Sequence, residues 1–162
     1  MEALRSHQRI APGRLKRSRR LRVIAITFGA SLLATATTAS FAGVASGSWY
    51  GPYSVGGYSY KNVATISTSS TLDQGRVKVQ VQSGSAPTGW MGTEPRAFRY
   101  STGALACQGP VTYSASVAVS LETGCAFTAA TGVGYYANGF THGWNGSTYK
   151  RWGSYNSPNQ NG

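Results

Sequence analysis

The chain has 162 residues and a formal net charge of +11, from 15 Lys and Arg against four Asp and Glu. Eight of the basic residues precede position 23, so the charge divides into +7 for residues 1–42, which include Glu2, and +4 for residues 43–162. The second part is long enough for one domain with a hydrophobic core and too short for two. Its small positive excess, with no basic run beyond Lys150-Arg151, argues against a nucleic-acid partner.

Residues 1–42 have the layout of an export signal, with a basic start, an apolar centre and small residues at a cleavage point. Residues 23–45 carry no charge, which predicts a signal helix. Ser40 and Ala42 predict cleavage after Ala42, and Ala45 is the next choice. An uncleaved anchor is the alternative, because this run is long enough to cross a bilayer. We expect a secreted, extracellular domain at residues 43–162, with membrane contact only through the signal segment.

The rest of the chain is rich in Gly, Ser and Thr and poor in strong helix formers, which predicts an all-β fold. In chain order, the expected strands lie at 49–60, 63–69, 76–82, 97–101, 111–121, 133–137 and 140–144. This spacing predicts a compact antiparallel sandwich or meander of six to eight short strands.

Two of these strands show the clearest alternation of apolar and polar residues. Three valines alternate with polar side chains in 76–82, and every odd position in 111–121 is apolar. Strict alternation indicates a strand with one buried face. Asn-Gly pairs at 138–139 and 145–146 predict tight hairpin turns, because such turns need positive φ at both central residues.

Cys107 and Cys125 are the only cysteines of the chain. An even number of cysteines in an exported protein predicts a disulfide, here between the ends of the 111–121 region. Closing a loop of this length contributes about 3 kcal/mol of stability. A catalytic thiol would need a histidine partner and a metal site would need more ligands, so we expect no cofactor and no metal.

Residues 43–162 contain few groups for catalysis: His142, Asp73, Glu94 and Glu122. His142 is expected to be an exposed histidine on a short strand. Glu94 is expected in a turn near Arg96, and Glu122 on the polar face of the 111–121 strand. Two carboxylates would suffice for glycoside hydrolysis, so that alternative stays open. The sparse set of groups predicts a protein that is not an enzyme.

Aromatic residues gather in two clusters, at 49–60 and 135–155, among Gly, Ser and Asn. Flat rings beside hydroxyl and amide groups can stack on sugars, and adjacent basic groups can contact an anionic polymer. The alternative is a structural role, because aromatic cross-strand pairs also stabilise small sheets. The candidate binding residues are Trp49, Tyr136, Trp144, Lys150, Arg151 and Trp152.

Several segments resemble small exported proteins of actinobacteria to which no function is assigned. They are Gly89-Trp90-Met91-Gly92, Pro95-Arg96, Phe98, Leu105, Cys107, Gly109 and residues 157–162. The resemblance implies secretion, a single disulfide and a compact β domain. It supplies no catalytic residues.

A second similarity is to the lactococcin-like bacteriocins, and it depends on Gly47-Ser48-Trp49 followed by Gly51. That resemblance implies a secreted β-sandwich that acts on a cell-wall precursor. Our leading hypothesis is a non-enzymatic interaction protein that binds a cell-envelope polymer, such as a cell-wall glycan, or an extracellular protein. The alternative hypothesis is a lactococcin-like bacteriocin.

Overall fold

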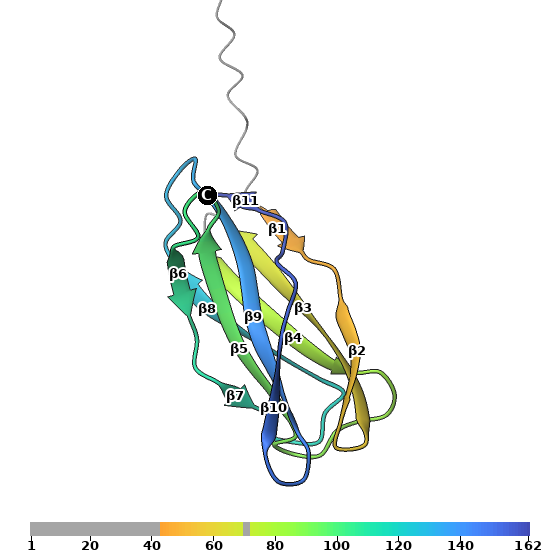
Figure 1. Cartoon of the computed structure of the whole chain (residues 1–162). Coiled ribbons are helices and arrows are strands. Elements are labelled where there is room, and N and C mark those ends of the chain that lie inside the picture. Colours follow the sequence, from red (N-terminus) through yellow and green to blue (C-terminus); the bar gives the residue numbers. More distant parts are fainter. Residues whose placement is uncertain (1–42, 70–71) are drawn as a thin grey trace, which may run out of the picture. The chain divides into compact units, whose positions relative to one another are not determined.

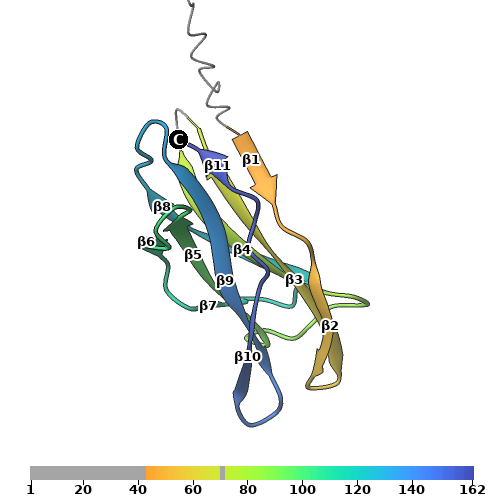
Figure 2. The same ribbon diagram turned by 45° about the horizontal axis from the view of Figure 1, so that its top comes forward.

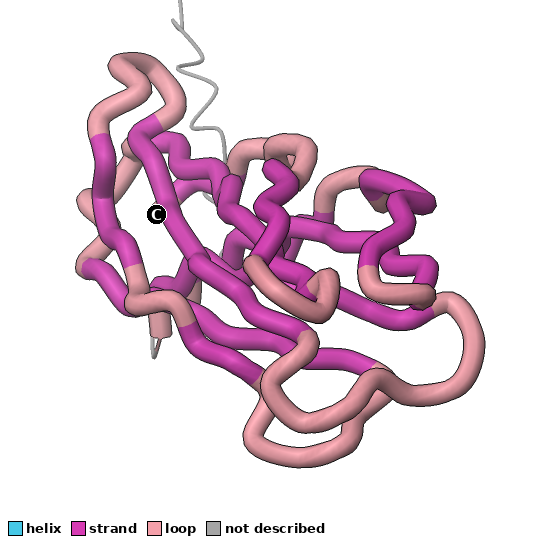
Figure 3. Tube along the Cα trace, turned by 60° about the horizontal axis from the view of Figure 1, so that its bottom comes forward, coloured by secondary structure: helices cyan, strands magenta, loops and turns pink. Residues whose placement is uncertain are grey.

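The computed structural model describes residues 43–69 and 72–162, which form two antiparallel β-sheets. Figure 3 shows that this part of the chain consists of strands and the loops that join them, without a helix that could cross a membrane. The all-β prediction is confirmed. The predicted signal helix and cleavage after Ala42 lie outside the described residues, and Ala45 lies within the first strand.

The first sheet has five strands, and β3 lies at its centre with three partners (Figure 1). Its path runs β1-β3-β4-β8, and β2 also pairs with β3. The strands are β1 (Gly43–Ser46), β2 (Tyr50–Val55), β3 (Tyr58–Thr68), β4 (Asp73–Val81) and β8 (Ser120–Phe127). The predicted strand at 76–82 is confirmed as part of β4.

The second sheet has six strands, with β9 and β5 at its centre. Its path runs β10-β9-β5-β6, while β11 pairs with β9 and β7 pairs with β5. The strands are β5 (Met91–Arg99), β6 (Leu105–Gln108), β7 (Thr112–Tyr113), β9 (Gly134–Trp144), β10 (Tyr149–Gly153) and β11 (Gln160–Asn161). The described residues therefore hold eleven strands, more than the six to eight expected, and β3 and β9 are each 11 residues long.

The core lies between the two sheets, which are stacked in Figures 1 and 2. Alternate residues of each strand point inward, as the period of a β-strand requires. Val77 and Val79 of β4, Ala97 of β5 and Ala137 of β9 are all almost fully buried. Burial of these side chains stabilises the sandwich by the usual transfer of apolar surface out of water.

Aromatic rings close one open edge of the sandwich, between β2 and β10. Tyr53 of β2 stacks on Trp152 of β10, with 4.3 Å between ring centroids. The Tyr53 hydroxyl lies 2.7 Å from the Thr141 hydroxyl, and the Asn62 amide donates to Thr141 at 2.8 Å. This seam joins strands of different sheets that share no backbone ladder.

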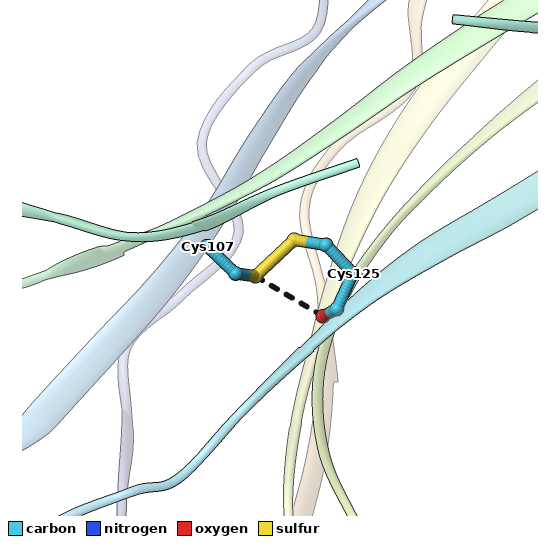
Figure 4. Close-up of a disulfide and its surroundings, with 2 residues drawn as sticks. All are labelled: Cys107 and Cys125. Carbon is cyan, nitrogen blue, oxygen red and sulfur yellow. Dashed lines mark hydrogen bonds between the residues drawn. A yellow bond between two sulfur atoms is a disulfide. The ribbon is translucent and has the colours of Figure 1, made fainter. Parts of the chain in front are cut away.

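The predicted disulfide is confirmed between Cys107 of β6 and Cys125 of β8 (Figure 4). Its two cysteines belong to different sheets, so the bond joins the sheets. Cys107 Sγ also lies 3.1 Å from the Cys125 carbonyl oxygen.

The predicted strand at 111–121 is wrong. The chain forms β7 at Thr112–Tyr113, leaves the six-stranded sheet, and joins the five-stranded sheet as β8 from Ser120. Between them, Ala118 makes only an isolated bridge with Ala86, and Val117 is 64% exposed. A segment that crosses between sheets cannot belong to one continuous ladder, whatever its alternation.

The hairpin predicted at Asn138-Gly139 is also wrong, because both residues lie inside the unbroken strand β9. Gly139 does not adopt positive φ. Instead, a Cβ at this position would lie 2.7 Å from the Glu94 carbonyl oxygen and 3.1 Å from Val77 Cβ, so glycine permits close packing. The second pair does mark a turn, since Gly146 has a φ of 101° between β9 and β10.

The five other expected strands have different bounds, and 63–69 and 97–101 belong to the ends of β3 and β5. The segment 49–60 is a hairpin, formed by β2 and the start of β3. The segments 133–137 and 140–144 form one strand, β9.

Candidate functional site

The outer face of the six-stranded sheet carries the charged and aromatic side chains that the core excludes. On β5 and β9 the odd-numbered residues Ala97 and Thr141 are buried between the sheets, so the even-numbered ones point outward. On β10 the outward residues are those that pair with even-numbered residues of β9. Arg151, for example, pairs with His142. We call this surface the outer face; it includes Glu94, Arg96, Tyr113, Tyr136, Phe140, His142, Trp144, Tyr149 and Arg151.

Glu94 is the centre of a hydrogen-bonded cluster on this face and is only 5% exposed. Its Oε1 accepts from Arg96 Nη2 at 2.6 Å and from Gln108 Nε2 at 3.1 Å. Its Oε2 accepts from Arg151 Nη2 at 2.7 Å. Such charge-assisted bonds are about twice as strong as neutral ones, so the cluster fixes the two guanidinium groups.

Phe140 forms the floor beneath the two arginines. The Arg151 guanidinium carbon lies 3.4 Å from the Phe140 ring centroid, and that of Arg96 lies 4.6 Å from it. Cations over an aromatic face are attracted by its negative quadrupole. The ring and the Glu94 carboxylate therefore hold both guanidinium groups close to the sheet.

The charges of the cluster shift two pKa values. Burial alone would raise the pKa of the Glu94 carboxyl, but hydrogen bonds and charges from Arg96 and Arg151 outweigh it and hold that pKa below its usual value. Burial lowers the pKa of His142, and the Arg151 charge lowers it further, against the opposing influence of Glu94. At neutral pH the cluster therefore holds a glutamate anion and an uncharged histidine.

Two sequence predictions for this region are wrong. The His142 side chain is 11% exposed rather than solvated, because Tyr113 and the Glu94 cluster cover it. Glu94 lies in the middle of β5 rather than in a turn, because Pro95 continues the strand and pairs with Gly139 of β9. The predicted proximity of Glu94 to Arg96 is confirmed.

Next to the cluster, a pocket of about 280 Å³ opens at the end of the sheet that carries the β9–β10 hairpin. This hairpin lies at the bottom of Figure 1. We call it the aromatic pocket; its lining residues are Thr88, Gly89, Trp90, Trp144 and Tyr149. Its volume suits a small ring-shaped ligand rather than a folded partner.

Contacts within the protein hold the rings of this pocket in place. The Tyr149 hydroxyl donates to the Gly89 carbonyl at 2.8 Å, and the Trp144 amide donates to the Trp90 carbonyl at 3.1 Å. The Trp144 and Tyr149 ring centroids are 4.9 Å apart, and Trp90 packs edge-on against Tyr58 at 5.5 Å. Because the rings are already ordered, a ligand would not have to bear the entropy cost of ordering them.

A second pocket of about 280 Å³ lies on the other side of the fold, beside β6 and the start of β9. Its lining residues are Arg99, Ala104, Leu105, Ala106, Phe127, Thr128 and Tyr135. Its two aromatic rings, Phe127 and Tyr135, pack against each other with 4.8 Å between centroids, and Tyr135 is almost fully buried. The aromatic pocket is therefore the better candidate site.

The structure divides the six predicted binding residues among three places. Trp144 and Arg151 lie together on the outer face, and Tyr136 lies on that face at the far end, stacked on Phe98. Trp152 and Lys150 are on the opposite side of β10, where Trp152 packs into the core seam.

Trp49 lies in a different part of the fold. Its ring contacts the Lys61 ammonium at 4.4 Å, and Lys61 projects from the outward side of β3 in the other sheet. It is 42% exposed and takes no part in the aromatic pocket.

Sequence reasoning missed Trp90, Tyr149 and Tyr113 as site residues. Trp90 follows Gly89, which has a φ of 78° and turns the chain toward the hairpin. A period of two along 136–144 would have placed Trp144 and His142 on one face, but the predicted turn at 138–139 interrupted that pattern.

The remaining carboxylates are far from this site. Glu122 is on the outward side of β8, in the other sheet, and lies 3.5 Å from Arg76. Asp73 accepts from the backbone amides of Ser69 and Ala129 at the start of β4. Glu94 and Glu122 therefore cannot flank one glycosidic bond, and the described residues contain no cluster of three metal-ligating side chains.

The chain matches no protein-family model, no curated protein and no solved structure.

Proposed function

We propose that the protein is exported and binds a cell-envelope glycan through the aromatic pocket, without catalysing a reaction. The observation that carries this proposal is the preordered group of Trp90, Trp144 and Tyr149 around an open volume of about 280 Å³. Aromatic faces beside a hydroxyl and a backbone carbonyl are the usual combination for stacking on a sugar ring and bonding its hydroxyls.

Two further features support binding at the cell surface. The basic and apolar start of the sequence supports export. A disulfide between the sheets suits an oxidising, extracellular compartment. An envelope glycan is the partner whose chemistry and location agree with both the pocket and the export signal.

The test uses the protein as cells release it into the medium, mixed with isolated cell walls and sedimented. We expect the protein to sediment with walls, and Trp144→Ala and Tyr149→Ala to abolish this by removing the stacking surface. Trp49→Ala is the matched control, because Trp49 is an exposed tryptophan beside the other sheet, between β1 and β2. Its binding should be unchanged.

Three results would contradict the proposal. They are retention of the protein inside cells, failure to sediment with walls, and equal loss of binding in Trp49→Ala and Trp144→Ala. The same preparation added to growing Gram-positive cells tests the bacteriocin hypothesis. Growth arrest at protein concentrations too low for the protein to bind isolated walls would favour the bacteriocin hypothesis.

A further inference from the structure

The outer face carries more positive than negative charge. Arg96 and Arg151 share one carboxylate, that of Glu94, and the lowered pKa of His142 leaves the imidazole uncharged at neutral pH. No other acidic side chain in residues 43–69 and 72–162 faces this surface, since Glu122 and Asp73 belong to the other sheet. The cluster therefore has a net charge of one positive unit.

Arg151 has free donors for a ligand. A guanidinium has five N–H groups, and the contact with Glu94 uses Nη2 alone. The Arg151 side chain is 45% exposed, whereas its carboxylate partner is buried beneath it. Phe140 covers one face of the guanidinium and Glu94 accepts from Nη2, so the donors at the other edges of this partly exposed group remain free for a ligand.

Arg151 is also close to the aromatic pocket. Trp144 pairs with Tyr149, and His142 pairs with Arg151 two residues further along the same strands. Two residues of a β-strand cover about 7 Å, which is within the length of a short oligosaccharide. Tyr113 bridges the interval, because its ring centroid lies 4.3 Å from that of Tyr149.

We propose that the site selects an anionic glycan, whose sugar ring stacks in the aromatic pocket while its acidic substituent binds Arg151. The substituent is a carboxylate or a phosphate, since both accept the planar donor pattern of arginine. This inference rests on the proposed function, because it needs the pocket to bind sugar. It adds the requirement for negative charge.

The first experiment compares an acidic glycan with its neutral ester and with a phosphate polymer, using the protein as released and titrated by tryptophan fluorescence. The probes are polygalacturonate, its methyl-esterified form, and a glycosylated poly(glycerol phosphate). We expect the acidic polygalacturonate to bind about tenfold more tightly than its neutral ester, from one charge-assisted contact. Salt should weaken the acidic complex more than the neutral one. The phosphate polymer distinguishes the two kinds of acidic group.

The second experiment removes the charge at two consecutive positions. Arg151→Gln should lose about the same tenfold on the acidic polymer and little on the ester. Lys150→Gln is the matched control, because it removes the same charge from the neighbouring residue on the opposite side of β10. It should change affinity less than twofold. Arg151→Lys, which keeps the charge and loses the planar fork, should be intermediate.

Equal affinity for the acid and the ester, or equal effects of the two glutamine variants, would overturn the anionic preference and leave glycan binding intact. If the protein bound none of the three polymers, the anionic preference would also be overturned. The wall-sedimentation assay would then test the proposed glycan binding separately. If circular dichroism shows that Arg151→Gln is unfolded, the anionic preference is tested by comparing the affinities of the unaltered protein for the acidic polymer and for its ester.

Discussion

The substitution Glu94→Gln should reveal how much the buried cluster stabilises the fold. The change keeps the shape of the side chain and removes its charge. Glu94 accepts three hydrogen bonds, two of them from arginines at 2.6 and 2.7 Å. A glutamine amide oxygen can replace only part of this set, and its NH₂ group would face a guanidinium donor.

The expected loss follows from the exposure of the partners. Breaking a fully buried ion pair costs about 3–5 kcal/mol, because the remaining charge has no partner. Here Arg96 and Arg151 retain access to water, which reduces the cost. We expect Glu94→Gln to lower the free energy of unfolding by about 2 kcal/mol at pH 7.

The loss should depend on pH. The pKa of Glu94 is lower in the folded protein than its ordinary value of 4.5, so its stabilisation is present above about pH 4.5. This stabilisation disappears as the pH falls through the folded-state pKa of Glu94. The carboxyl is then protonated and uncharged, like the glutamine side chain of the variant. The difference between Glu94→Gln and the unaltered protein should therefore close in acid.

Urea unfolding, followed by tryptophan fluorescence from pH 3 to 8, measures both quantities. Glu122→Gln is the matched control, because Glu122 pairs with Arg76 at 3.5 Å on the exposed side of β8. A pair of this kind contributes about 1 kcal/mol or less. Equal losses for the two variants, or a Glu94→Gln loss that does not shrink as the pH falls below 4.5, would refute this account of the cluster.

Two other substitutions test the packing of the two sheets. Gly139→Ala should cost about 1–3 kcal/mol, because its Cβ would lie 2.7 Å from the Glu94 carbonyl oxygen. Gly153→Ala, where the nearest atom is 3.9 Å away, serves as the control in the same unfolding assay, and equal losses would contradict the argument. Replacing Cys107 and Cys125 together by serine should lower stability by about 3 kcal/mol, since the bond closes an 18-residue separation. A midpoint unchanged in urea would show that the bond does not stabilise the fold.

Sequence patterns predicted the strands whose two faces differ consistently. The three valines of 76–82 alternate with polar residues, and β4 has both a buried and a solvated face along its length. The alternation at 111–121 led to a wrong prediction, because the period of apolar residues does not identify the strand with which a segment pairs. The start of that segment pairs with β5 in one sheet, and its end pairs with β4 in the other. Its pairing partners therefore depend on residues that are distant in the sequence.

The site was predictable only in part for the same reason. Trp144 and Arg151 belong to one hairpin, so their proximity follows from the Asn-Gly turn between them. The contact of His142 with Glu94 depends on the register of β5 against β9, where Glu94 pairs with Phe140. Composition and local spacing carry no information about that register.

The strand order also has a consequence for how fast the protein folds. Strand pairs in both sheets join distant parts of the chain: Met91 pairs with Gly143 at the centre of the six-stranded sheet, and Asp73 of β4 pairs with Phe127 of the edge strand β8. Loop closure has to precede such contacts, which slows folding into the range of milliseconds to seconds for all-β domains. The two cysteines are separated by only 18 residues and bring β6 and β8 together. We therefore expect an early disulfide to shorten the search by which the two sheets find each other.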